Sequence, residues 1–211
     1  MKNFSNILLL ACLLTGCAQT KKEALFNGKD LSNWHFVVED NRVPADRVFS
    51  VRDESILIQG TPVGYMYTQK KYGNCTLELE WRWVDEPTNS GIFLLITDPT
   101  SPFPKGIECQ LHAGDAGDFV LLGGSDMAEY SQPEGQERPR FPAIKKRGES
   151  SEKPAGEWNK ARILIRDGQV TVYINDVLQN TGTSSVKEGY IGLQSEGKSI
   201  AFRNITVTGM R

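Results

Sequence analysis

The chain has 211 residues, of which 39% are hydrophobic and 24% are charged. This length and composition fit one globular domain, or two small ones, and exclude a disordered chain and a protein with many membrane spans. Lys and Arg number 24 against 26 Asp and Glu, for a formal net charge of −2. Because there is no basic excess to neutralise phosphates, we expect no nucleic-acid partner.

The amino terminus has the pattern of an export signal. Lys2 precedes an apolar run over 7–14, which small residues and Cys17 follow. The run is shorter than the roughly 20 apolar residues of a membrane-spanning helix. Residues 14–17 resemble the bacterial lipobox, in which cleavage leaves Cys17 as a lipidated first residue. The alternative is an ordinary signal peptide that contains Cys17.

These features predict three segments. Residues 1–16 form a lipoprotein signal peptide, 17–24 form a lipidated anchor and polar tether, and 25–211 form the domain. Several acyl chains on one cysteine would anchor the protein firmly, and its contact with the membrane would be through these chains only. Because Ala18 rather than Asp follows the cysteine, we expect the bacterial cell envelope, at the outer membrane, as its location.

Alternating apolar and polar residues predict strands. From Cys75 to Val84 the alternation is strict and places Glu78, Glu80 and Arg82 on one outward face. Residues 91–96 are a short apolar run between turn residues, which is typical of an interior strand. Later strands are expected over 161–166, 169–174, 190–194 and 200–207.

Turn residues separate these strands. Asp167-Gly168 predicts a type I′ hairpin, and Asn175-Asp176 supplies the next turn. A single helical turn is expected over 44–49. Many short strands between turns predict an all-β fold, an antiparallel sandwich. Two long loops, 97–106 and 123–158, interrupt the pattern, and the second is expected to border a ligand site.

Two cysteines lie within the predicted strands, Cys75 and Cys109. In an exported protein they form either a disulfide or two buried thiols, and the sequence leaves both open. No Cys-x-x-Cys pair and no Cys/His cluster points to zinc.

Six motifs in order resemble the 3-keto-disaccharide hydrolase family and span about 25–208. The motifs lie at Leu25–Trp34, Asn89–Phe93, Glu108–Gln110, Lys153–Asn159, Gly192–Gln194 and Phe202–Ile205. The resemblance implies a concanavalin-like jelly-roll sandwich that acts on keto-sugars or oligosaccharides. One departure is His112, where family members usually carry Asp.

The strand 107–112 offers the leading catalytic candidates. Glu108, Gln110 and His112 would share one face, with Glu108 and His112 about 13–14 Å apart along the strand. Glu108 or His112 can serve as a base, and Gln110 can bind a sugar hydroxyl. The alternative is a solvated strand face.

The remaining candidates are substrate contacts and metal ligands. Trp158 can stack on a sugar ring, and Glu80 and Arg82 offer polar contacts from the other row. Asn89 and Gln194, in two family motifs, are further candidates for substrate binding. If a divalent metal is bound, Glu108, His112, Asp115 and Asp118 are the candidate ligands, although a plain turn is the alternative for 114–118.

The family resemblance implies an enzyme that cleaves 3-keto-glycosides by hydrolysis or elimination, and these residues give it a candidate site. A ketone at C3 acidifies the proton on C2, so a base can remove it and the C1 substituent can leave. The alternative is a non-catalytic carbohydrate-binding module displayed on the envelope. No Gly-x-Ser-x-Gly, P-loop or His-Glu-x-x-His sequence points to another chemistry.

Overall fold

The computed structural model describes residues 21–210. The predicted signal peptide, 1–16, and Cys17 lie outside the described residues and remain predictions. Among the described residues, no helix is long and apolar enough to cross a membrane.

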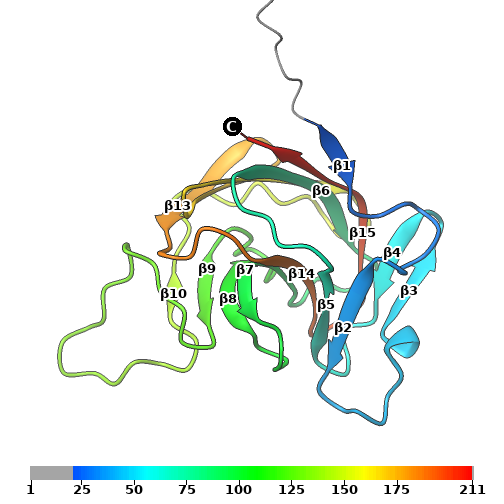
Figure 1. Cartoon of the computed structure of the whole chain (residues 1–211), viewed down its shortest axis with the longest axis horizontal. Helices are drawn as coiled ribbons and strands as arrows, with labels where there is room; N and C mark the ends of the chain where they lie inside the picture. Colours follow the sequence, from blue (N-terminus) through cyan, green and yellow to red (C-terminus); the bar gives the residue numbers. More distant parts are fainter. Residues whose placement is uncertain (1–20, 211) are drawn as a thin grey trace, which may run out of the picture.

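Two antiparallel sheets form a sandwich (Figure 1). The eight-stranded sheet contains, in spatial order, β13 (Val177–Thr183), β12 (Gln169–Ile174), β11 (Asn159–Arg166), β6 (Cys75–Trp83), β15 (Ile200–Gly209), β4 (Ser55–Ile58) and β3 (Phe49–Arg52), with β1 (Lys22–Ala24) paired to β15. The seven-stranded sheet contains β10 (Ala143–Ile144), β9 (Phe119–Leu122), β8 (Lys105–Gln110), β7 (Gly91–Asp98), β14 (Tyr190–Ser195), β5 (Gly64–Thr68) and β2 (Trp34–Val38). This architecture confirms the all-β, concanavalin-like jelly-roll sandwich.

The first strand lies within the segment expected to be a tether. In β1, Lys22, Glu23 and Ala24 pair with residues 206–208 of β15. The sheet therefore begins three residues before the predicted domain start at residue 25. The short helical turn expected over 44–49 is present as a 3-10 turn, η1, at Ala45–Arg47.

The main core lies between the sheets. In β6 buried and half-buried residues alternate along the whole strand, as the sequence pattern predicts. Trp81 and Trp83 are buried on the inner face and meet edge to face, with ring centroids 5.8 Å apart. Glu80 and Arg82 therefore point away from the core, out of the eight-stranded sheet.

Both predicted turns have the positive φ angles that tight hairpin turns require. Asp167 and Gly168, between β11 and β12, have φ angles of 50° and 87°. Asn175 and Asp176, between β12 and β13, have φ angles of 48° and 65°. Two consecutive positive φ values are the mark of a type I′ hairpin, whose twist matches that of the strands.

The two cysteines lie in different sheets. Cys75 is in β6 and Cys109 is in β8, and both are buried free thiols. Of the two possibilities open from the sequence, the structure shows the pair of buried thiols.

The outer face of the seven-stranded sheet is also largely covered. Tyr65, Phe93, Val120 and Leu122 form a second buried cluster there, apart from the main core, with Phe103 packed against it. Glu108 faces the same side, because its register partners are Phe93 and Val120. A carboxyl group thus lies among apolar side chains on this face.

Candidate functional site

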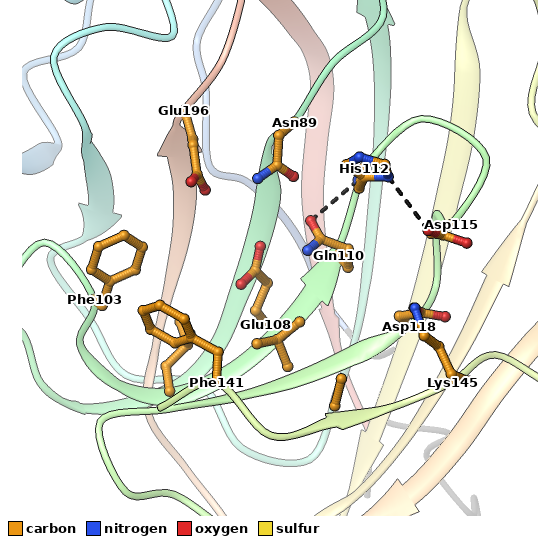
Figure 2. A pocket seen from close by; sticks show the side chains of 13 residues that line it. Asn89, Phe103, Glu108, Gln110, His112, Asp115, Asp118, Phe141, Lys145 and Glu196 are labelled. Carbon is orange, nitrogen blue, oxygen red and sulfur yellow. Dashed lines mark hydrogen bonds and ion pairs between the residues drawn. The ribbon is translucent and has the colours of Figure 1, made fainter. Parts of the chain in front are cut away.

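A pocket of about 350 Å³ opens on the outer face of the seven-stranded sheet. Strands β8 and β9 form its floor, and loops from both ends of the sheet form its walls (Figure 2). Its polar lining comes from Asn89, Glu108, Gln110, His112, Asp115, Asp118, Lys145 and Glu196. The pocket thus brings together most of the candidates from the strand 107–112 and the following turn.

Glu108 is a buried carboxyl group in the pocket. Its residue is only 3% exposed, and its Oε1 has no hydrogen-bond partner among the described residues. Gly91, diagonally across from it on β7, leaves the space for it, since a Cβ on Gly91 would overlap the Glu108 carboxyl group. The Glu108 carboxyl group is therefore buried, and no cation among residues 21–210 forms an ion pair with it.

Glu196 is a second carboxyl group in the pocket, and the sequence analysis missed it. It follows β14, and Gln194 Nε2 donates a 2.8 Å hydrogen bond to its Oε2. Figure 2 shows the carboxyl groups of Glu108 and Glu196 turned toward each other, with the Asn89 amide beside Glu196. The signal for Glu196 was its position two residues after Gln194, on the same side of an extended segment.

The pKa values of both carboxyl groups are raised. Burial raises the pKa of Glu108 well above the ordinary range, and the nearby charge of Glu196 raises it further. Burial also raises the pKa of Glu196, but the Gln194 and Asn89 amides and the His112 imidazole act in the opposite direction. The two groups are therefore unequal: Glu108 holds its proton more firmly, and Glu196 is better stabilised as a carboxylate.

His112 does not lie on the strand that was predicted to carry it. Strand β8 ends at Gln110, whose Oε1 accepts hydrogen bonds from the backbone N–H groups of Leu111 and His112 at 3.1 and 3.2 Å. The turn comes only after His112, since the Leu111 N–H still donates to the Ser90 carbonyl and the Asp115 N–H donates to the His112 carbonyl. His112 Nδ1 lies 3.4 Å from Asp115 Oδ2 at the mouth of the pocket.

Asp118 does not fit the predicted role of a metal ligand. Lys145 Nζ donates to its Oδ2 at 2.8 Å, and the Lys146 backbone N–H donates to its Oδ1 at 2.7 Å. Both oxygens are engaged, and the lysine ammonium group repels a cation. Across residues 21–210, no group of three or more His, Cys, Asp or Glu is placed to hold a metal ion.

Two aromatic residues close one side of the pocket. Phe103 comes from the loop after β7 and Phe141 from the loop before β10, and their ring centroids are 4.9 Å apart. Arg140 Cζ lies over both rings, at 5.5 and 4.8 Å from their centroids. The loop 123–158, expected to border a ligand site, therefore borders this pocket.

Glu80, Arg82 and Trp158 do not belong to this pocket. They lie on the outer face of the eight-stranded sheet, where Arg203 Nε donates to Glu80 Oε2 at 2.6 Å. Arg82 and Trp158 line a separate cavity there. The two polar rows of the sequence therefore belong to two separate sites, because β6 and β8 are in opposite sheets and their outward faces diverge.

Gln194 and Asn89 are both in the pocket region, but only Asn89 lines the pocket. Gln194 is fully buried, so it contacts Glu196 rather than a ligand directly. Asn89 lines the pocket beside Glu196. Gln194 is therefore a positioning residue for the second carboxyl group.

The fold and this site define a concanavalin-like jelly-roll domain with a carboxyl-lined pocket on one sheet. Residues 21–208 match the family model described as the 3-keto-alpha-glucoside-1,2-lyase-like domain, and the chain belongs to this family.

Similar proteins agree with that assignment. A protein of Bacteroides thetaiotaomicron named 3-keto-disaccharide hydrolase is 27% identical over 229 aligned residues, which cover 87% of this chain and 76% of the relative. A crystal structure of a putative glycosyl hydrolase from Parabacteroides distasonis has a TM-score of 0.64 at 21% identity, covering 90% of this chain and 94% of the other. The carbohydrate-binding module CBM66 from Bacillus subtilis has a TM-score of 0.61 at 11% identity, covering 84% and 96%. These structural matches bear on the fold alone.

Proposed function

We propose that this protein cleaves the glycosidic bond of 3-keto-glycosides in the pocket of Glu108 and Glu196. Its family membership and its relative named 3-keto-disaccharide hydrolase support the substrate class. The observation that carries the proposal is the buried Glu108 carboxyl group, which has an unpartnered oxygen and faces a second carboxyl group. Burying an unpaired carboxyl group costs stability, and simple sugar binding does not require it. Acid–base catalysis does require a carboxyl group with a shifted pKa.

The chemistry of the substrate calls for one base and one acid. The ketone at C3 acidifies the C2 proton, and a base removes it to give an enolate. The C1–O bond then breaks, a C1–C2 double bond forms, and the departing oxygen takes up a proton. Addition of water at C1 completes a net hydrolysis; without that step the reaction is an elimination.

The two carboxyl groups suit these two roles. Glu108, with its raised pKa, carries a proton that it can donate to the departing oxygen. Glu196, which the Gln194 amide stabilises as a carboxylate, is placed to accept the C2 proton. His112 lies at the mouth, where it can contact substrate hydroxyls, so it acts in binding in this scheme.

Gln110 is suited to stabilise the enolate. Its side-chain oxygen is held by two backbone N–H groups, so the amide nitrogen is the group left to donate a hydrogen bond. A donor fixed before the reaction stabilises developing negative charge on the C3 oxygen without reorganisation.

A turnover experiment in deuterated water tests the proposal. The protein is incubated with a 3-keto-glucoside, and we expect cleavage with deuterium at C2 of product or recovered substrate. Cleavage to a product that keeps the original hydrogen at C2 would contradict removal of that proton. Binding of keto-sugars without any turnover would instead support the carbohydrate-binding module.

Matched variants locate the reaction. Glu108→Gln and Glu196→Gln should each lower kcat by about 100-fold or more, since each removes one proton-transfer group. Glu80→Gln, on the opposite sheet, should leave kcat unchanged. Equal losses in all three variants would place the chemistry elsewhere.

We also propose that the protein is anchored to the bacterial envelope, at the outer membrane, through lipid on Cys17. The lipobox-like segment over 14–17 supports this location. Cys17→Ala should move the protein from the membrane fraction to the soluble fraction and abolish incorporation of labelled fatty acid. Persistence of membrane attachment in that variant would refute lipidation at Cys17.

A further inference from the structure

A second cavity, of about 450 Å³, lies on the outer face of the eight-stranded sheet. Strands β3, β4, β6 and β15 contribute to it, together with the segment that leads into β11. It shares no lining residue with the Glu108 pocket, and the two sites open on opposite faces of the sandwich. Its volume is in the range that small-molecule sites occupy.

The cavity contains a half-buried charge that the fold leaves unpaired. The Arg82 guanidinium donates one hydrogen bond, from Nη1 to the carbonyl of Gly156 at 3.3 Å. Its Nε is buried without a partner, and no carboxylate within residues 21–210 forms an ion pair with it. Arg203, by contrast, is neutralised by Glu80 at 2.6 Å. A guanidinium with free donors and no ion pair is suited to bind an anion.

Trp158 holds this guanidinium in place. Arg82 Cζ lies 4.7 Å from the centroid of the indole ring, and Arg203 Cζ lies 3.9 Å from it. The ring is therefore engaged by two cations, and its role here is to fix Arg82 rather than to stack on a sugar. A guanidinium that is fixed in advance loses less entropy when it binds a carboxylate in a forked arrangement.

The rest of the cavity wall combines polar and apolar side chains, as sugar-binding sites do. Ser55 and the exposed Asp53 present polar groups, whereas Leu57, Val84 and Ala201 form an apolar surface. Such a wall can receive the hydroxyl groups and the C–H face of a sugar ring.

We propose that this cavity binds an acidic sugar, with the sugar carboxylate on Arg82. This site is separate from the pocket of the proposed function, and the proposal does not depend on the catalytic activity. It gives the protein a second contact with a glycan, on the face opposite the reaction.

Calorimetric titration tests the proposal with D-glucuronate as probe and D-glucose and acetate as comparisons. Arg82→Gln removes the guanidinium. Arg162→Gln is the matched control, because Arg162 also stacks on an aromatic ring of the same sheet, 4.0 Å from the Tyr173 centroid, but lies outside the cavity. Glu108→Gln reports on the other pocket.

We expect saturable binding of glucuronate that Arg82→Gln weakens by about tenfold or more, as the loss of a charge-assisted pair predicts. Arg162→Gln and Glu108→Gln should keep the wild-type affinity, and glucose and acetate should bind more weakly than glucuronate. Three results would overturn the proposal: no binding, equal binding of acetate, or binding that depends on Glu108 rather than on Arg82. If Glu108→Gln loses turnover of the 3-keto-glucoside but still binds glucuronate, the Arg82 cavity is independent of the proposed reaction.

Discussion

Gly91 on β7 and Glu108 on β8 occupy one space, because the carboxyl group lies where a side chain on Gly91 would be. Strand alternation alone would put both side chains on the outer face, and only glycine at 91 lets the carboxyl group lie flat against the sheet. The burial of Glu108, and hence its raised pKa, depends on the absence of one methyl group from a neighbouring strand.

Gly91→Ala should therefore damage catalysis more than folding. The new methyl group must displace the Glu108 carboxyl group, and a shift of about 1 Å in a reacting group lowers the rate by about 100-fold. Overpacking should cost about 1–3 kcal/mol of stability. Initial rates with a 3-keto-glucoside and urea denaturation measure the two effects. Gly209→Ala, at an exposed strand end where the methyl group meets nothing within 4 Å, is the control and should change neither.

The raised pKa of Glu108 predicts how stability depends on pH. The folded state binds the Glu108 proton more tightly than the unfolded state does, so the free energy of unfolding falls as pH rises above the ordinary glutamate value near 4.5. Between the two pKa values, the free energy of unfolding falls by up to about 1.4 kcal/mol per pH unit, and above the pKa of the folded state it no longer depends on this group. Glu108→Gln should lack this contribution.

Urea denaturation of both proteins from pH 4.5 upward measures that difference. We expect Glu108→Gln to gain stability relative to wild type as pH rises, with Glu196 present in both proteins. A difference that stays constant over the range would mean that Glu108 titrates normally in the folded state.

Asp118 should be important for the pocket wall. It is buried and binds both the Lys145 side chain and the Lys146 backbone, which fixes the part of the loop 123–158 that follows β10 to the sheet. Asp118→Asn should lower the free energy of unfolding by about 2 kcal/mol, since one donor loses its charged partner. Amide hydrogen exchange should rise over 141–147. Unchanged exchange in that segment would show that other contacts hold the loop.

The two buried thiols should be unreactive in the folded protein. Burial raises the pKa of Cys75 to about 11 and raises that of Cys109 further, so little thiolate is present at neutral pH. Peptide mapping after iodoacetamide treatment should show modification of both residues only when denaturant is added. Detection of a Cys75–Cys109 disulfide in unreduced protein would contradict the separation of the two residues between the sheets.

The strands could be predicted because apolar and polar residues alternate along each one, which tells which side chains point inward and which point outward. The alternation in 75–84 is enough to place Trp81 inward and Arg82 outward, and Asp167-Gly168 is enough to predict a type I′ turn. The outward position of Glu108 follows from the same local rule. The sequence can therefore predict which site residues share one strand face.

The composition of the site could not be predicted, because it depends on the order of strands in each sheet. Nothing in 75–84 or 105–110 indicates that β6 and β8 lie in different sheets, so the sequence alone could not show whether Arg82 and Glu108 line one groove or two. The strand end was placed two residues too late, because β8 ends at Gln110, whose side chain accepts hydrogen bonds from the next two backbone N–H groups. Glu196 was missed because it meets Glu108 only when β14 and β8 flank β7.

The pocket draws its reacting groups and its shape from different parts of the chain. Glu108 belongs to a strand that is paired on both sides, whereas Phe141 and its neighbours belong to a long loop that Asp118 fastens to the sheet after β10. Under the proposed function, a change in that loop would alter which leaving group fits, while the two carboxyl groups would keep their positions. Selectivity and reactivity would then depend on different segments of this chain.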